Sequence, residues 1–138
     1  MFRNVVVCLS VLALPQAGWA ADDCAVVDSW LTAQGAGVAD LGPGQCSGQV
    51  NPDGQVCRWD FPYRADAAQA AFDAMSARLL ACAGPDRLLA DDQQVNHPDS
   101  YALNRYALED KEVALSLKDK ASLGKSLIFL RTAPLTRD

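Results

Sequence analysis

The residues of this sequence that could do chemistry are few, and the most suggestive of them are neighbours. His97 is the only histidine, and Pro98, Asp99 and Ser100 follow it. A histidine titrates near neutral pH, so it can act as a general base, with a carboxylate to orient it and a hydroxyl or a water as nucleophile. The run therefore indicates a small cell-envelope hydrolase as one hypothesis. Residues so close in sequence cannot easily aim at one another, and the same run is typical of the turn before a strand, which is the interpretation we favour.

Cysteines offer a second kind of chemistry, because they can bind metals, cycle between redox states or form disulfides. Cys8 lies in a segment that we expect to be removed, which leaves Cys24, Cys46, Cys57 and Cys82. No two of these four have the close Cys-x-x-Cys spacing of zinc and thioredoxin-like sites, and one histidine cannot complete a usual catalytic zinc set. We therefore expect no metal, no cofactor and two structural disulfides.

The four cysteines allow three pairings, which geometry can rank. A strand that begins near Cys57 should climb roughly 20 Å, and the helix that ends near Cys82 should return roughly 25 Å, so the two ends should meet. We favour Cys57 with Cys82, which leaves Cys24 with Cys46. The main alternative joins Cys46 to Cys57, but a tight two-residue hairpin would set these two cysteines out of register and too far apart.

Lys118, Lys120 and Lys125 cluster around one strand connection of an otherwise acidic protein. A basic tip of this kind could dock an acidic protein partner or a polyanionic component of the cell envelope. Lysines near strand ends also discourage unwanted sheet pairing, and we favour this second interpretation.

Asp86, Asp91 and Asp92 follow the second helix expected from the sequence. A calcium loop of the EF-hand type would need regular spacing and a central glycine, which are missing. We expect a solvated acidic loop here.

The start of the chain predicts export. Arg3 precedes an apolar run over residues 5–14, and small residues lead up to Ala20. This order is typical of a secretory signal peptide, here residues 1–20, cleaved between Ala20 and Ala21. The apolar run is too short for a membrane anchor, so we expect no membrane insertion after cleavage and a periplasmic or extracellular location.

The remaining chain, residues 21–138, has the length of one domain. Half of all 138 residues are hydrophobic and 21% are charged, which is ordinary for a globular protein. The formal net charge is −5. An acidic surface repels phosphate backbones, so nucleic acid is not an expected partner.

Hydrophobic periodicity predicts the elements that must position these residues. A short helix is expected at about 22–34 and a long helix at about 65–83, where Asp66 and Gln69 form a candidate capping box. Alternating or continuous apolar stretches predict strands at 55–63, 101–108, 113–117 and 127–130. Short connections between the last three strands require antiparallel pairing.

These elements predict an α+β fold, in which an antiparallel sheet of about four strands carries the long helix on one face. The residues expected to supply much of the core are Trp59, Phe61, Phe72, Met75, Leu79, Leu115, Leu117, Ile128 and Leu130.

Catalytic groups are scarce in this sequence, whereas the outer face of the sheet and the loops could present a surface. We therefore expect a non-catalytic exported protein that binds a protein or a cell-envelope component, as an inhibitor, a chaperone-like accessory or another interaction protein. The alternatives are the His97 hydrolase and a small-ligand carrier with a pocket between helix and sheet.

Overall fold

The computed structural model describes residues 19–32, 45–47, 54, 56–96 and 99–136. Most of the expected signal peptide, and His97, lie outside the described residues. The elements in chain order are α1 (Trp19–Thr32), β1 (Gln45–Ser47), β2 (Val56–Pro62), α2 (Asp66–Ala83), the 3-10 turn η2 (Pro85–Arg87), β3 (Leu88–Asn96), β4 (Asp99–Leu108), β5 (Lys111–Lys120), the 3-10 turn η3 (Ala121–Leu123) and β6 (Lys125–Pro134).

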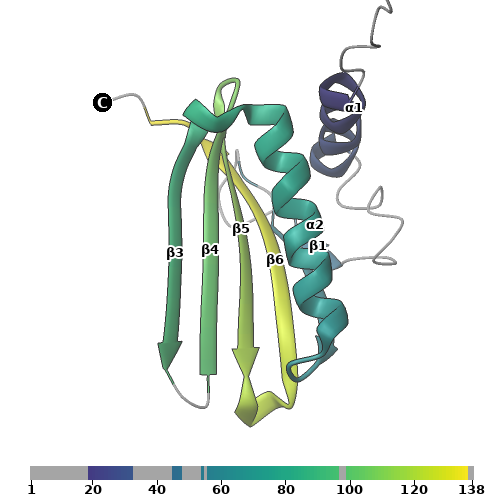
Figure 1. Cartoon of the computed structure of the whole chain (residues 1–138), viewed down its shortest axis with the longest axis vertical. Helices are drawn as coiled ribbons and strands as arrows, with labels where there is room; N and C mark the ends of the chain where they lie inside the picture. Colours follow the sequence, from purple (N-terminus) through teal and green to yellow (C-terminus); the bar gives the residue numbers. More distant parts are fainter. Residues whose placement is uncertain (1–18, 33–44, 48–53, 55, 97–98, 137–138) are drawn as a thin grey trace, which may run out of the picture.

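The strands form one antiparallel sheet in the order β1-β2-β6-β5-β4-β3. Helix α2 lies along one face, which we call the inner face, and α1 packs beside α2 (Figure 1). The α+β class and the antiparallel sheet are confirmed. The expected count of about four strands is too low, because the described part of the sheet has five long strands, β2 to β6, and the three-residue β1.

The expected acidic loop is the strand β3, so that prediction is wrong for Asp91 and Asp92. They pair with Asn104 and Leu103 of β4. Aspartate is unfavourable in central strands. However, β3 is an edge strand of the sheet, and the side chains of both aspartates stay exposed to water there. Pairing with β4 therefore overrides local propensity.

Helix α2 follows the predicted boundaries closely but begins in a different way. Its buried residues recur at helical spacing and face the sheet. The candidate capping box is wrong, because Ala65 is the N-cap residue and no side chain caps it, while Gln69 Nε2 donates to Asp73 Oδ1 at 2.9 Å. The helix ends at Gly84, whose φ of 88° is poorly tolerated by other residues and whose N–H donates to Leu80 O at 2.8 Å.

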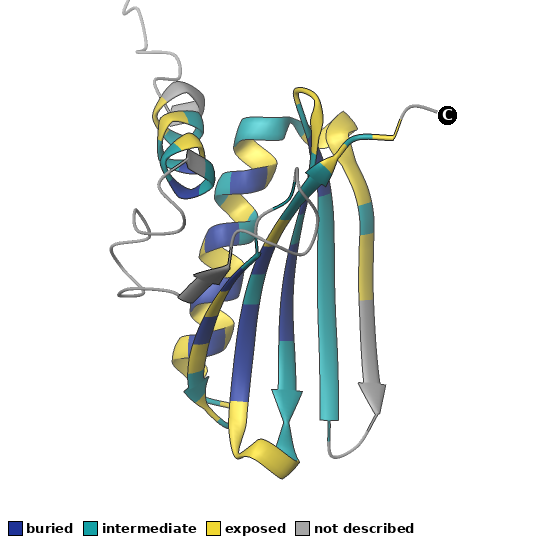
Figure 2. Cartoon of the chain, turned by 180° about the vertical axis from the view of Figure 1, so that it is seen from behind, coloured by how far each residue is buried: buried dark blue, intermediate teal, exposed yellow. Residues whose placement is uncertain are grey.

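The hydrophobic core lies between α2 and the inner face (Figure 2). Eight of the nine predicted core residues are buried, and Phe61 packs against them while partly exposed. Helix α1 adds Val27 and Trp30 to the same core. Tyr106 links β4 to α2, because its hydroxyl donates to Ser76 O at 3.3 Å, and burial is the main reason why the pKa of this phenol is raised.

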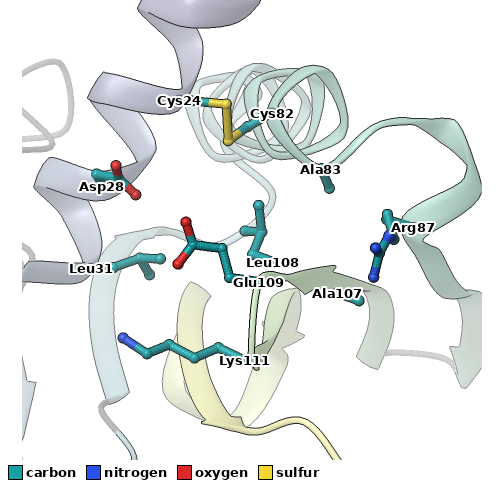
Figure 3. A pocket seen from close by; sticks show the side chains of 10 residues that line it. All are labelled: Cys24, Asp28, Leu31, Cys82, Ala83, Arg87, Ala107, Leu108, Glu109 and Lys111. Atoms are coloured by element: carbon teal, nitrogen blue, oxygen red, sulfur yellow. A yellow bond between two sulfur atoms is a disulfide. The ribbon is translucent and has the colours of Figure 1, made fainter.

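The disulfide pairing expected from the sequence is wrong. Cys24 of α1 is bonded to Cys82 near the end of α2, with Cα atoms 4.8 Å apart (Figure 3). Cys57 is therefore not the partner of Cys82, although it is itself disulfide-bonded and lies opposite Cys46 in the β1–β2 pair. In the expected register Cys46 lies opposite Trp59, whereas the observed register is shifted by two residues and places Cys46 opposite Cys57.

A polar network closes the end of the core beside the start of α2. The Asp119 carboxylate accepts hydrogen bonds from Ser100 Oγ, at 2.5 Å, and from Ser126 Oγ. Ser126 has no exposed surface, and its hydroxyl also accepts a hydrogen bond from the backbone N–H of Arg64 at 2.8 Å. Asp119 thereby joins β4, β5 and β6 to the turn that enters α2.

Replacing Asp119 by alanine is expected to lower the free energy of unfolding by about 2–3 kcal/mol, because the buried Ser126 hydroxyl loses its acceptor. Urea denaturation of the variant would measure this loss. Asp110→Ala, at an exposed position in the β4–β5 turn, is the matched control and should change stability by less than about 0.5 kcal/mol. Equal losses in the two variants would contradict a stabilising role of the network.

Candidate functional site

The face of the sheet that points away from α2, which we call the outer face, carries a hollow of about 310 Å³. Its side chains come from every second residue of three neighbouring strands, so they lie in rows across the sheet. This outer hollow is lined by Tyr101, Leu103, Arg105, Glu112, Ala114, Ser116, Lys118, Phe129 and Arg131.

Lys118 occupies one end of the outer hollow between two aromatic rings. Its Nζ lies 5.3 Å from the ring centroid of Tyr101 and 5.1 Å from that of Phe129. Both distances allow cation–π attraction. The pKa of Lys118 is lowered, first because burial disfavours the ammonium and then because Arg131 and Lys120 add positive charge nearby.

The other end of the outer hollow contains an ion pair. Arg105 binds Glu112 in a bidentate manner, with Nε–Oε1 at 2.7 Å and Nη2–Oε2 at 2.6 Å. Hydrogen bonding to Arg105 is the main reason why the pKa of Glu112 is lowered, and the same bonds raise the pKa of Arg105. This pair therefore has little charge left to offer a ligand.

The three lysines predicted as a basic tip all belong to the outer face, but their surroundings differ. Lys120 Nζ lies 2.8 Å from Asp99 Oδ2, and Lys125 Nζ lies 2.7 Å from Asp60 Oδ2. Asp60 also pairs with a third cation, Arg58, at 2.8 Å. The carboxylates thus neutralise the positive charges of the lysines at the β5–β6 connection. Lys118 lies apart from this connection, in the outer hollow.

Lys118 and Arg131 are the two outer-face cations with no ion pair among the residues that the structure describes. Sequence reasoning missed Arg131, and with it the rings of Tyr101 and Phe129. A signal was present, because Lys125, Phe129 and Arg131 alternate with core residues along β6. The interpretation of 127–130 as one continuous apolar run hides the face of the sheet to which Phe129 belongs.

The candidate catalytic residues Asp99 and Ser100 have other partners. The Asp99 carboxylate accepts hydrogen bonds from Lys120 Nζ at 2.8 Å and from the backbone N–H of Ala121 at 3.0 Å, and these bonds lower its pKa. Ser100 Oγ donates to Asp119 Oδ2. As neighbours in β4, the two side chains point to opposite faces of the sheet. His97 lies outside the described residues, so its position relative to them stays a prediction.

A second hollow, of about 580 Å³, lies where α1, the end of α2 and the β4–β5 turn meet (Figure 3). The Cys24–Cys82 disulfide borders it, and the side chains of Leu31, Leu108 and Glu109 extend into the same space. Its volume is within the range of small-ligand pockets. A small-ligand carrier would use this hollow, and that function stays a prediction.

Metal-binding clusters and membrane-spanning helices can be judged only for the residues that the structure describes. Among them, no group of three or more His, Cys, Asp or Glu side chains is placed to hold a metal ion. No helix in these ranges is both long and apolar enough to cross a membrane.

The chain was also compared with known proteins. No protein-family model and no curated protein matches it.

Proposed function

We propose that this chain is a small exported, non-catalytic protein that binds another macromolecule through the outer face of its sheet. The observation that carries this proposal is the outer hollow, which is lined by two aromatic rings, by apolar side chains and by two cations without an ion pair among the described residues. Aromatic and arginine side chains are enriched at the centres of protein interfaces, where they supply much of the binding energy.

The surroundings of the candidate catalytic residues favour binding over hydrolysis. Asp99 holds the β5–β6 connection through Lys120 and Ala121, and Ser100 belongs to the polar network around Asp119. Stabilising contacts therefore account for both side chains without a catalytic role.

Export is supported by two independent features. The N-terminal sequence has the order of a signal peptide. The Cys24–Cys82 bond is of a kind that forms and persists in oxidising compartments.

The test is site-specific photo-crosslinking in intact cells that export the protein. A photoreactive phenylalanine analogue at Ala114, within the outer hollow, is expected to give one discrete adduct. The same analogue at Ala77, on the exposed side of α2, should not give it. The adduct should also disappear when Phe129 is replaced by alanine in the Ala114-labelled protein, because a ring of the hollow is then missing.

Two results would overturn the proposal, provided that the labelled proteins unfold at the same temperature. One is the absence of an adduct from Ala114. The other is the same adducts from Ala114 and Ala77, since a specific surface cannot produce both.

A further inference from the structure

We infer that the outer hollow binds a short acidic polypeptide segment, with a side-chain carboxylate between Lys118 and Arg131 and apolar side chains against Tyr101 and Phe129. This inference rests on the proposed function, and it names the chemistry of the partner.

The charges of the outer face are mostly neutralised by ion pairs. Four of its cations form ion pairs with carboxylates. The pairs are Arg105 with Glu112, Lys120 with Asp99, and both Lys125 and Arg58 with Asp60. On the outer face, the cations left without an ion pair among the described residues are Lys118 and Arg131, which border the same hollow from neighbouring strands. Their charges are close enough for Arg131 to lower the pKa of Lys118. An anion bound in the hollow near both cations would relieve this repulsion.

The small number of cations available on the outer face favours a carboxylate over a polymer of phosphates. A polyanion gains affinity by contacting a row of cations and releasing its counterions, so it needs several basic side chains that are not already neutralised. The four other cations of the outer face are already paired with carboxylates among the described residues. The formal charge of −5 would also repel a long polyanion. The repulsion of a short acidic segment is weaker, because the segment carries fewer negative charges.

The two aromatic rings of the outer hollow favour a ligand that also carries apolar groups. Tyr101 and Phe129 flank Lys118 and border the floor formed by Leu103 and Ala114. An acidic peptide presents carboxylates and apolar side chains within a few ångströms of each other, and it can therefore contact the cations and the rings together. Polyphosphate has no apolar group that could pack against the rings.

The experiment is an NMR titration of the isotope-labelled chain with three probes. They are a blocked hexapeptide of alternating glutamate and phenylalanine, its counterpart with glutamine in place of glutamate, and inorganic polyphosphate. We expect the acidic peptide to shift the amide signals around Lys118 and Arg131, with a dissociation constant that increases with salt. The glutamine peptide and polyphosphate should bind roughly tenfold more weakly or not at all.

Variants then test the two cations. Lys118→Gln combined with Arg131→Gln should weaken the acidic peptide roughly tenfold or more. The matched control combines Lys111→Gln with Arg87→Gln, which removes the same two charges beside the other hollow and should leave binding unchanged. Unchanged unfolding temperatures would show that both double variants are folded.

Each other outcome overturns the inference. Equal binding of the glutamine peptide would exclude a carboxylate clamp, and tighter binding of polyphosphate would identify a polyanion site. If no probe binds while the Ala114 crosslink persists, the inference fails and the proposed function stands. If the crosslink is absent as well, both fail.

Discussion

Replacing Leu79 by alanine is expected to lower the free energy of unfolding by about 3–5 kcal/mol, a large part of the ~5–15 kcal/mol that stabilises a typical domain. Leu79 lies on the face of α2 that packs against the sheet, and it has no exposed surface. Its truncation removes buried apolar area and leaves a cavity, because the paired strands of the inner face hold the opposite wall in place.

The chain offers its own control in the next residue. Leu80 belongs to the same helix, but 38% of its surface is exposed, so Leu80→Ala removes few contacts and should cost less than about 1 kcal/mol. Urea denaturation with a common slope would give both values. Similar losses in the two variants would mean that α2 is rotated about its axis relative to the arrangement described above.

The long helix and its buried stripe were predictable because they are local. Phe72, Met75 and Leu79 recur at a spacing that only a helix places on one face, and the apolar alternation of β2 and β5 is just as direct. No distant contact is needed to interpret either pattern. The predicted core therefore matches the observed one closely.

Features that depend on distant contacts were missed. Asp91 and Asp92 have the composition of a loop, and they form a strand only because β4 provides a partner. The register of Cys46 and Cys57 depends on a connection whose geometry composition does not give. In the outer hollow, Lys118 was found from its charge, but which lysines are neutralised depends on aspartates that approach from other strands.

Removing the Cys24–Cys82 disulfide has the second largest expected effect. The bond joins residues 58 apart in sequence, and a closed loop of that length restricts the unfolded chain by about 4 kcal/mol in the chain-entropy model. We expect Cys24→Ser combined with Cys82→Ser to lower the free energy of unfolding by about 2–4 kcal/mol, and the unfolding temperature by roughly 10 °C.

The matched control places serine beside each cysteine. Ala25 and Ala81 are exposed neighbours in the same two helices, so Ala25→Ser combined with Ala81→Ser changes helix propensity alone and should cost about 1 kcal/mol or less. An effect of the cysteine variant no larger than this would contradict a stabilising bond. Peptide mapping of the unreduced protein checks the pairing itself. A peptide that links Cys57 to Cys82 would contradict the Cys24–Cys82 bond and support the pairing expected from the sequence.

The same variant also separates the role of the disulfide from that of the core. Val27 and Trp30 remain buried against α2 and the sheet when the bond is absent, so α1 keeps an apolar attachment. Hydrogen exchange of α1 amides should accelerate by more than that of β5 amides, because α1 loses its disulfide crosslink to α2, whereas β5 keeps its pairing with β4 and β6. If β5 accelerates equally, then α1 and the sheet unfold as one unit, and the bond stabilises the whole domain rather than the position of α1.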